Sequence, residues 1–419
     1  MSILIIPIIM DTIHNLVTQS AFGNSEEQLK ARRDIREAAA RAGIRPASIH
    51  SLYMGFARGE VKGFSVPAIN VRNMTFDFAC LIFRLAKELH VGPFIFEISR
   101  GEADYTGQPH DEYATTVLAA AVATGWKGPV YIQADHTQFS AEKFALDPSG
   151  QLEILKKMVK TAIDAGFYNI DIDASTLVDL TKSDLSEQQK NNAEMTAQLT
   201  NYIRSIEPYG VTVSIGAEIG HIGGKNSTVP DFEAFMELFL AQVSQEKPLL
   251  SKLSVQTGTS HGGIMLPDGT MKEVALDFDV HKSIAKVARE KYGMGGPVQH
   301  GASTLPVDLF HRFVEAEAIE VHLATGFQNI IFNAMPERIK REMNTWLDAN
   351  CTGERKEGQT DEQFHYVTRK KANKQFKKAL WELSDEEKKP IMDGIEKELR
   401  AVFQELHVVN TDTIIKKYV

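Results

Sequence analysis

The sequence contains only two cysteines in 419 residues and has no excess of positive charge. Cys80 and Cys351 cannot build a disulfide framework and show no metal-ligand spacing, so we expect a reducing, cytoplasmic environment. The formal net charge of -9 argues against nucleic acid as the main partner, because phosphate backbones are usually bound by basic faces. A small anionic substrate needs only a few local donors and remains compatible with this charge.

Long hydrophobic runs are also missing. No segment approaches the roughly 18 apolar residues that a membrane span needs, so we expect no membrane partner. The opening segment MSILIIPIIM is short, lacks a basic region and soon meets Asp11 and His14, so we do not expect a signal peptide. The composition is that of an ordinary soluble protein, and the length suits one barrel of about 250 residues with extensions as well as it suits two domains.

From about residue 62, short β-branched runs alternate with amphipathic helical stretches, which predicts a parallel sheet covered by helices. Eight such units favour a closed (β/α)8 barrel, the TIM-barrel fold, over an open doubly wound sheet. We assign the barrel to residues 49–334. The predicted strands cover residues 64–70, 93–98, 129–135, 168–173, 211–218, 251–258, 297–300 and 319–324.

Two extensions flank the predicted barrel. Residues 1–48 have a helical pattern, with a capping box predicted at Ser25–Gln28. Residues 335–419 are rich in Lys and Glu and repeat the cap signal at Ser384–Glu387. We expect the second extension to be a solvated helical arm that packs on the barrel or on a neighbouring subunit.

Polar residues stand where the predicted strands end. The carboxyl ends of barrel strands converge on one face, where the active sites of such barrels lie, so these side chains should meet in one mouth. Three imidazoles with an open fourth position make a catalytic zinc site. Any single histidine of this kind is as easily a hydrogen-bonded core residue, but joint placement at strand ends favours a metal site. The residues concerned are Asp135, His136, Asp173, Glu218, His261, His300 and His322.

The residues around these histidines suit ligand binding. Asp135 stands beside His136, where a carboxylate can donate or accept a proton on a substrate that the metal polarises. Gly262 and Gly301 each follow a histidine and leave room for a ligand to approach the backbone, whose N–H groups can bind phosphate.

In order and spacing, eight segments resemble the class II, metal-dependent ketose-bisphosphate aldolases over about residues 50–333. The segments are GFSVPAIN, EISRGEADYTG, IQADHTQ, NIDIDAST, AEIGHIGG, TGTSHGG, VQHGASTLP and the weaker EVHLATGF. The resemblance implies a zinc-stabilised enediolate formed from dihydroxyacetone phosphate, which attacks an aldehyde; the reverse reaction cleaves the ketose bisphosphate. It also implies a sugar phosphate as partner and a homo-oligomer, either a dimer or a tetramer.

The resemblance further implies a role for each matching residue. His136, His261 and His300 would bind the zinc, and Glu218 and Asp173 would lie near a second or alternative cation position, divalent or monovalent. Asp135 would transfer the proton of the aldehyde-derived hydroxyl. The implied substrate and phosphate contacts are Asn70, Ser99, Gly262, Gly301, Ser303 and Thr325.

Several positions depart from the family pattern. Ile264 and Met265 replace a tyrosine and a phosphate-binding lysine, and Lys225 and Asn226 replace acidic loop residues, one of them implicated in proton abstraction. His322 replaces a substrate-binding asparagine and becomes a candidate for proton transfer. Arg100 stands where the family has a neutral residue, and its guanidinium could bind phosphate in place of the missing lysine; an exposed structural arginine is an equal interpretation.

Three functions therefore remain open. The first is aldol cleavage of a phosphorylated ketose. The second is epimerisation or isomerisation of a sugar, sugar phosphate or sugar acid on the same metal barrel, with His322 or His221 in the proton chemistry. The third is a non-catalytic partner subunit of a true aldolase, which the bound metal would argue against.

Overall fold

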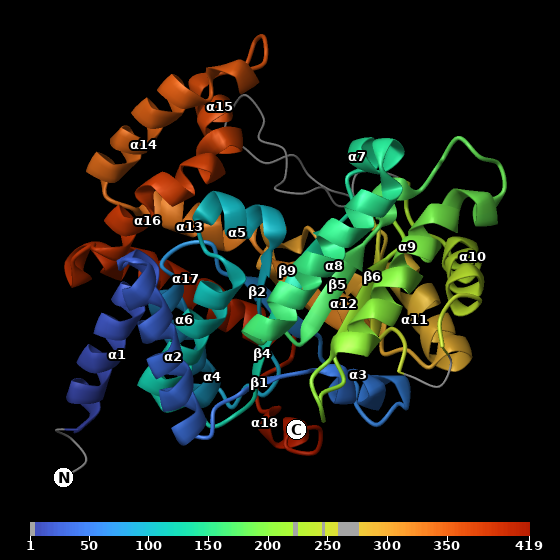
Figure 1. The fold of residues 1–419 in the computed structure, drawn as a ribbon, viewed down its shortest axis with the longest axis horizontal. Coiled ribbons are helices and arrows are strands. Elements are labelled where there is room, and N and C mark those ends of the chain that lie inside the picture. Colours follow the sequence, from blue (N-terminus) through green and yellow to red (C-terminus); the bar gives the residue numbers. More distant parts are fainter. Residues whose placement is uncertain (1–4, 221–224, 245–247, 259–275) are drawn as a thin grey trace.

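A computed structural model describes residues 5–220, 225–244, 248–258 and 276–419. In these residues, eight parallel strands follow one another around a barrel from β2 to β9, and the barrel closes where β9 pairs with β2 (Figure 1). The predicted (β/α)8 barrel is therefore confirmed. The strands are β1 (Pro46–Ala47), β2 (Val66–Asn70), β3 (Ile95–Ser99), β4 (Val130–Gln138), β5 (Asn169–Asp173), β6 (Ser214–Glu218), β7 (Lys252–Val255), β8 (Gly296–Gln299) and β9 (Glu320–Leu323).

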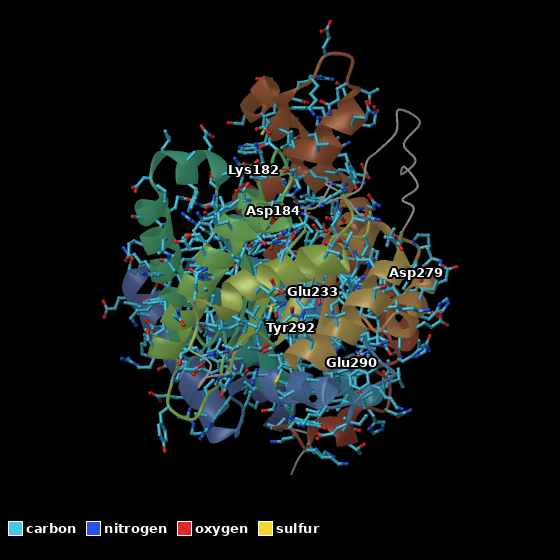
Figure 2. All side chains as sticks on the ribbon, turned by 90° about the vertical axis from the view of Figure 1, so that its right-hand side faces the viewer. Lys182, Asp184, Glu233, Asp279, Glu290 and Tyr292 are labelled. Atoms are coloured by element: carbon cyan, nitrogen blue, oxygen red, sulfur yellow. The ribbon has the colours of Figure 1, made fainter. Side chains whose placement is uncertain are left out.

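Helices surround the barrel, and most of the long ones bury an apolar face. On α10, Phe232, Phe235 and Phe239 recur at helical spacing and are fully buried, whereas Glu233 lies on the outer surface of the same layer (Figure 2). The helices are α1 (Ile5–Phe22), α2 (Ser25–Arg41), α3 (His50–Ala57), α4 (Thr75–Glu88), α5 (Arg100–Thr106), α6 (His110–Thr124), α7 (Ala141–Leu146), α8 (Pro148–Ala165), α9 (Leu185–Ile206), α10 (Val229–Leu240), α11 (Phe278–Tyr292), α12 (His311–Glu315), α13 (Thr325–Ala334), α14 (Glu337–Asn350), α15 (Asp361–Thr368), α16 (Asn373–Trp381), α17 (Asp385–Glu405) and α18 (Asp412–Ile415), with short 3-10 turns η1 (Ser175–Leu177), η2 (Ala302–Thr304), η3 (Val307–Leu309), η4 (Thr352–Glu354) and η5 (Arg369–Ala372).

The N-terminal extension differs from the expectation in two details. The cap of α2 is Asn24 rather than Ser25, because the Asn24 side chain accepts from the backbone of Glu26 and Glu27 and the Glu27 carboxylate accepts from the Asn24 backbone at 2.8 Å. The segment also ends in the short strand β1, which pairs with the start of β4. It therefore joins the sheet rather than remaining wholly helical.

The C-terminal extension packs on the barrel along most of its length. The cap of α17 at Ser384, with Glu387 as its partner, is as predicted. The backbone N–H of Ser65, just before β2, donates to Leu406 O at 3.0 Å after α17. Helices α14 and α15 stand over one side of the barrel (Figure 1), and the end of α15 and η5 line the cavity at its mouth. Across the described ranges, no helix has the length and apolar character to cross a membrane.

Candidate metal and active site

The carboxyl end of β4 is irregular, and this irregularity directs two side chains into the mouth. Ala134 pairs with Ile170 but Thr137 pairs with Ile172, so β4 carries one extra residue there. His136 accordingly has a φ of 43°, in the left-handed region that residues other than glycine rarely adopt. Consecutive residues of a regular strand point to opposite faces, whereas here Asp135 Oδ2 lies 3.5 Å from His136 Nε2.

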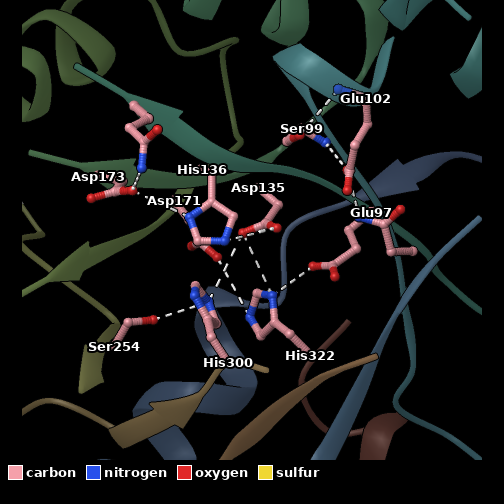
Figure 3. Close-up of polar contacts among 12 residues, drawn as sticks. Glu97, Ser99, Glu102, Asp135, His136, Asp171, Asp173, Ser254, His300 and His322 are labelled. Carbon is pink, nitrogen blue, oxygen red and sulfur yellow. Dashed lines mark hydrogen bonds and ion pairs between the residues drawn. The ribbon is translucent and has the colours of Figure 1, made fainter. Parts of the chain in front are cut away.

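Three imidazoles meet above the barrel interior. His136 from β4, His300 just after β8 and His322 on β9 converge in Figure 3. The ring centroids of His136 and His300 are 4.5 Å apart, and those of His300 and His322 are 4.0 Å apart. Two of the expected zinc ligands thus lie together, while His261 and Gly262 fall outside the described residues.

Glu218, at the end of β6, completes a first group of metal-ligand atoms. Its Oε2 is 3.7 Å from His136 Nδ1 and 3.7 Å from His300 Nδ1. These three residues offer ligand atoms within 4.8 Å of one another, and Glu218 and His300 are buried. Two imidazole nitrogens and one carboxylate oxygen form a donor set that suits zinc and similar divalent ions. We call His136, Glu218 and His300 the outer group.

Asp173 lies next to the outer group and contacts His136. Its Oδ2 lies 3.3 Å from His136 Nδ1 and accepts from Gln138 Nε2 at 2.6 Å, while its Oδ1 accepts from Ser175 Oγ at 2.7 Å. Burial alone would raise the pKa of Asp173, but the hydrogen bond and charge of His136 lower it to about 2. Asp173 therefore faces the same ring nitrogen of His136 as Glu218 does, which keeps it beside the expected cation position.

The electrostatics of the outer group favour a cation. Burial lowers the pKa of His136, but the carboxylates of Asp135, Asp173 and Glu218 together hold it well above its usual value. Burial, followed by the charge of Asp173, raises the pKa of Glu218 well above its usual range. Buried negative charge contributes to both shifts, beside the burial of Glu218 itself, and a divalent metal would neutralise that charge. The residues present therefore fit the metal that the sequence predicted.

An ionic network fills the barrel below the histidines. Lys252 Nζ, from β7, donates to Asp171 Oδ2 at 2.9 Å, to Glu320 Oε1 at 2.5 Å and to Gln133 Oε1 at 2.7 Å. The Tyr53 hydroxyl also donates to Glu320. None of these residues was singled out in the sequence, where a lysine at the start of a short strand is typical of an exposed edge.

His322 stands between this network and the mouth. Its Nδ1 lies 2.9 Å from Glu97 Oε2, and its Nε2 lies 2.7 Å from Glu320 Oε1. Burial lowers the pKa of His322, but the charges of Glu97 and Asp135 and the contact with Glu320 hold it well above the usual value. The imidazole is therefore held on both sides by carboxylates from β3 and β9.

A cavity of about 630 Å³ rises from these residues to the surface. Asp135, His136, His300 and His322 line its floor, together with Glu97. The other lining residues expected from the sequence are Asn70, Ser99, Arg100, Gly301, Ser303 and Thr325.

The loops after β8 and β9 meet along one wall of the cavity. Thr325 is the first residue of α13, where backbone N–H groups attract anions. The next residue, Gly326, packs so tightly that a Cβ there would lie 2.2 Å from Ser303 O. Gly301 has a φ of 71°, which glycine adopts without strain. This wall therefore presents backbone donors to the cavity.

Asn70 and Ser99 line the cavity, and both are held in place by Glu102, which the sequence analysis did not predict. Glu102 Oε2 accepts from Asn70 Nδ2 at 2.6 Å, and Arg72 pairs with the other oxygen of Glu102. Ser99 caps α5 by accepting from the Glu102 backbone, so its hydroxyl already has a structural role. The capping-box spacing from Ser99 to Glu102 was the available signal for this arrangement.

Part of the cavity wall comes from the C-terminal extension, whose contribution to the site was not predicted from the sequence. Tyr366, Arg369 and Lys370 line the cavity, as Arg100 does, and η5 packs against α5. The side chain of Arg369 lies over the rings of Phe332 and Tyr366. No local pattern in the sequence signals that this segment returns to the mouth.

The fold and these polar groups define a (β/α)8-barrel protein with a buried cluster of potential metal ligands at its mouth. The family model of class II fructose-bisphosphate aldolase matches residues 52–388, and the chain belongs to this family. No curated protein matches the chain.

Two solved structures share the fold. The fructose-bisphosphate aldolase of Campylobacter jejuni is 20% identical, with a TM-score of 0.51 over 85% of this chain and 93% of that one. The fructuronate-tagaturonate epimerase UxaE of Cohnella laeviribosi is 12% identical, with a TM-score of 0.51 over 83% of this chain and 82% of that one. Both likenesses concern the barrel architecture.

Proposed function

We propose that the protein catalyses the reversible aldol cleavage of a phosphorylated ketose, with dihydroxyacetone phosphate as the three-carbon product. One observation carries this proposal: a single cavity joins His136 and His300 of the outer group at its floor to backbone anion donors on one wall and to the cations Arg100 and Lys370 at its rim. Membership in the aldolase family supports the reaction class.

The floor of the cavity supplies the reactive groups. A divalent metal held by His136, Glu218 and His300, with His261 as the further ligand expected from the sequence, would act as a Lewis acid on the ketose carbonyl. Asp135 lies beside His136 and can take the proton of the substrate hydroxyl when the carbon–carbon bond breaks. Its burial keeps bulk water away from that proton.

The walls of the cavity supply anion recognition. Gly301, Ser303 and Thr325 would bind the phosphate nearest the metal through backbone and hydroxyl donors. Arg100 and Lys370 line the cavity and are both exposed, and neither takes part in a salt bridge with another described residue. An unpaired cation at a cavity rim is available to a substrate phosphate. This placement favours a ketose that carries an anionic group at its far end.

A coupled assay for triose phosphate release from fructose and tagatose bisphosphates tests the proposal. We expect turnover by the zinc-loaded protein, and we expect Arg100→Ala or Lys370→Ala to raise KM about tenfold, or about 1.4 kcal/mol of binding per lost contact. Arg341→Ala, an exposed arginine of α14 outside the cavity lining, is the matched control and should leave KM unchanged. The absence of triose release with metal fully loaded would refute the proposal.

Epimerisation of a ketose or uronate is the second candidate, and one observation favours it. His322 and Glu97 line the same cavity as Asp135 but belong to other strands, β9 and β3. Two sets of acid–base groups around one substrate carbon can remove a proton from one face and return it to the other. An NMR screen that detects epimerised sugars without triose release would select this reaction over aldol cleavage.

A further inference from the structure

Two carboxylate oxygens at the floor of the cavity have no hydrogen bond from any described residue. They are Glu97 Oε1 and Asp135 Oδ1, and the two residues are 0% and 5% exposed. Both residues line the cavity. A buried acceptor without a donor is costly, so each oxygen marks a place where a bound molecule would supply the missing hydrogen bond.

Glu97 lies one layer below Asp135 in the barrel. Ser99 of β3 pairs with Asp135 of β4, and Glu97 stands two residues before Ser99, on the same side of the strand. Glu97 Oε2 lies 2.9 Å from His322 Nδ1, and Asp135 Oδ1 lies 3.5 Å from the same nitrogen (Figure 3). The two carboxylates are therefore neighbours, and one substrate molecule can contact both.

The second oxygen of Glu97 fixes the position of the first. Glu97 Oε2 accepts from Gln133 Nε2 at 3.2 Å and faces the imidazole of His322. These contacts from β4 and β9 hold the carboxylate at the cavity floor. Oε1 is left without a donor among the described residues and is available to a ligand.

We propose that Glu97 determines specificity by hydrogen bonding, through Oε1, to a free hydroxyl group of the ketose. This hydroxyl is distinct from the one whose proton Asp135 takes. The assignment rests on the proposed function, which places a phosphorylated ketose in the cavity.

The chemistry of Glu97 selects a hydroxyl over a phosphate. Phosphate oxygens are hydrogen-bond acceptors, so an ionised Glu97 cannot pair with them. Burial raises the pKa of Glu97 to about 8. A hydroxyl suits both protonation states, because it donates to the carboxylate and accepts from the carboxylic acid.

The cavity then separates its polar groups by type. Acceptors without donors lie at the floor, on Glu97 and Asp135, whereas the cations Arg100 and Lys370 lie at the rim. The substrate class that matches this arrangement is a polyhydroxylated chain with two free hydroxyl groups in its middle and an anionic group at its far end.

Binding of two uncleavable bisphosphates tests the role of Glu97 without turnover. Mannitol or galactitol 1,6-bisphosphate, whichever binds more tightly, carries hydroxyl groups between its phosphates, and hexane-1,6-diol bisphosphate carries none. Isothermal titration calorimetry on zinc-loaded protein should show the hexitol bound about 100-fold more tightly, because two hydroxyls bond to buried carboxylates. Glu97→Ala should reduce this ratio about tenfold, and Glu97→Gln, which keeps an acceptor oxygen, should recover part of it.

A matched control and a folding check accompany these variants. Glu153→Ala, which removes an exposed carboxylate on α8 paired with Lys156, should leave the ratio unchanged. Thermal melting establishes that each variant is folded before its binding is measured.

A ratio in folded Glu97→Ala equal to that of the unchanged protein would overturn the assignment, whether both compounds bind as before or both bind more weakly. A ratio near one in the unchanged protein would overturn it as well. The outcome is separate from the proposed reaction. Selective binding of the hexitol without triose release from ketose bisphosphates would remove the aldolase proposal alone, and triose release with an unchanged ratio in Glu97→Ala would remove the assignment of Glu97 alone.

Discussion

Replacing Lys252 by methionine tests whether the ionic network in the barrel is a main source of stability. Lys252 is 1% exposed, and its ammonium contacts Asp171 and Glu320 at 2.9 and 2.5 Å. Methionine keeps an unbranched apolar chain but removes the charge. Two buried carboxylates would then lose the cation that compensates them.

The expected loss of stability follows from that burial. Breaking a buried ion pair by removing one partner costs about 3–5 kcal/mol, because the remaining charge stays out of water. The entropy of unfolding is about 2.1 cal/mol/K per residue, so the 419-residue chain changes Tm by about 1 °C per kcal/mol. We therefore expect Lys252→Met to lower Tm by about 4 °C.

Differential scanning calorimetry on metal-free protein measures this change. Lys291→Met is the matched control, because Lys291 pairs with Glu233 at 2.7 Å on the surface, where both side chains are at least 36% exposed. Such a pair contributes about 0–1 kcal/mol, so its Tm should fall by about 1 °C or less. Adding Glu320→Gln to Lys252→Met should recover part of the loss. Equal shifts for the two lysine variants would refute the reasoning.

Two further predictions concern pH and the cavity wall. Burial lowers the pKa of His281 to about 4, so the unfolded chain takes up a proton before the folded chain does, and stability should fall as pH drops from about 6.5 to 4. His281→Gln should reduce this fall when Tm is measured against pH. An unchanged dependence of Tm on pH in this variant would contradict the assignment. Gly326→Ala should raise KM for the phosphorylated ketose about tenfold, because its Cβ would lie 2.2 Å from Ser303 O and separate the loops after β8 and β9. The control Gly353→Ala, whose Cβ would meet nothing within 4 Å, should leave KM unchanged. Similar KM values for the two variants would show that this wall does not bind substrate.

The barrel was predictable because its strands are buried on both faces and therefore appear in the sequence as short apolar runs. The predicted strand at residues 93–98 corresponds to β3 (Ile95–Ser99), and the one at 297–300 to β8 (Gly296–Gln299). Polar residues that interrupt such runs at their ends had to face the mouth. This reasoning located Asp135, His136 and His300, which do lie together.

The features that escaped prediction depend on contacts between distant segments. Arg369 and Lys370 reach the cavity only because the C-terminal extension folds back over the barrel, and no local periodicity records that return. Asp171 and Lys252 are polar residues inside strands, and their burial is stable only because each neutralises the other across the barrel. The bulge at His136 likewise arises from the register between β4 and β5, which one strand alone does not specify.

The central claim, that the outer group holds a metal that activates a ketose carbonyl for aldol chemistry, is tested most directly by hydrogen exchange at the carbon next to that carbonyl. Dihydroxyacetone phosphate is incubated in D2O with the protein and followed by proton NMR. The account predicts that zinc-loaded protein exchanges one hydrogen of the hydroxymethyl carbon, and that metal-stripped protein and His300→Ala do not. Absence of exchange by fully metal-loaded protein would contradict the account.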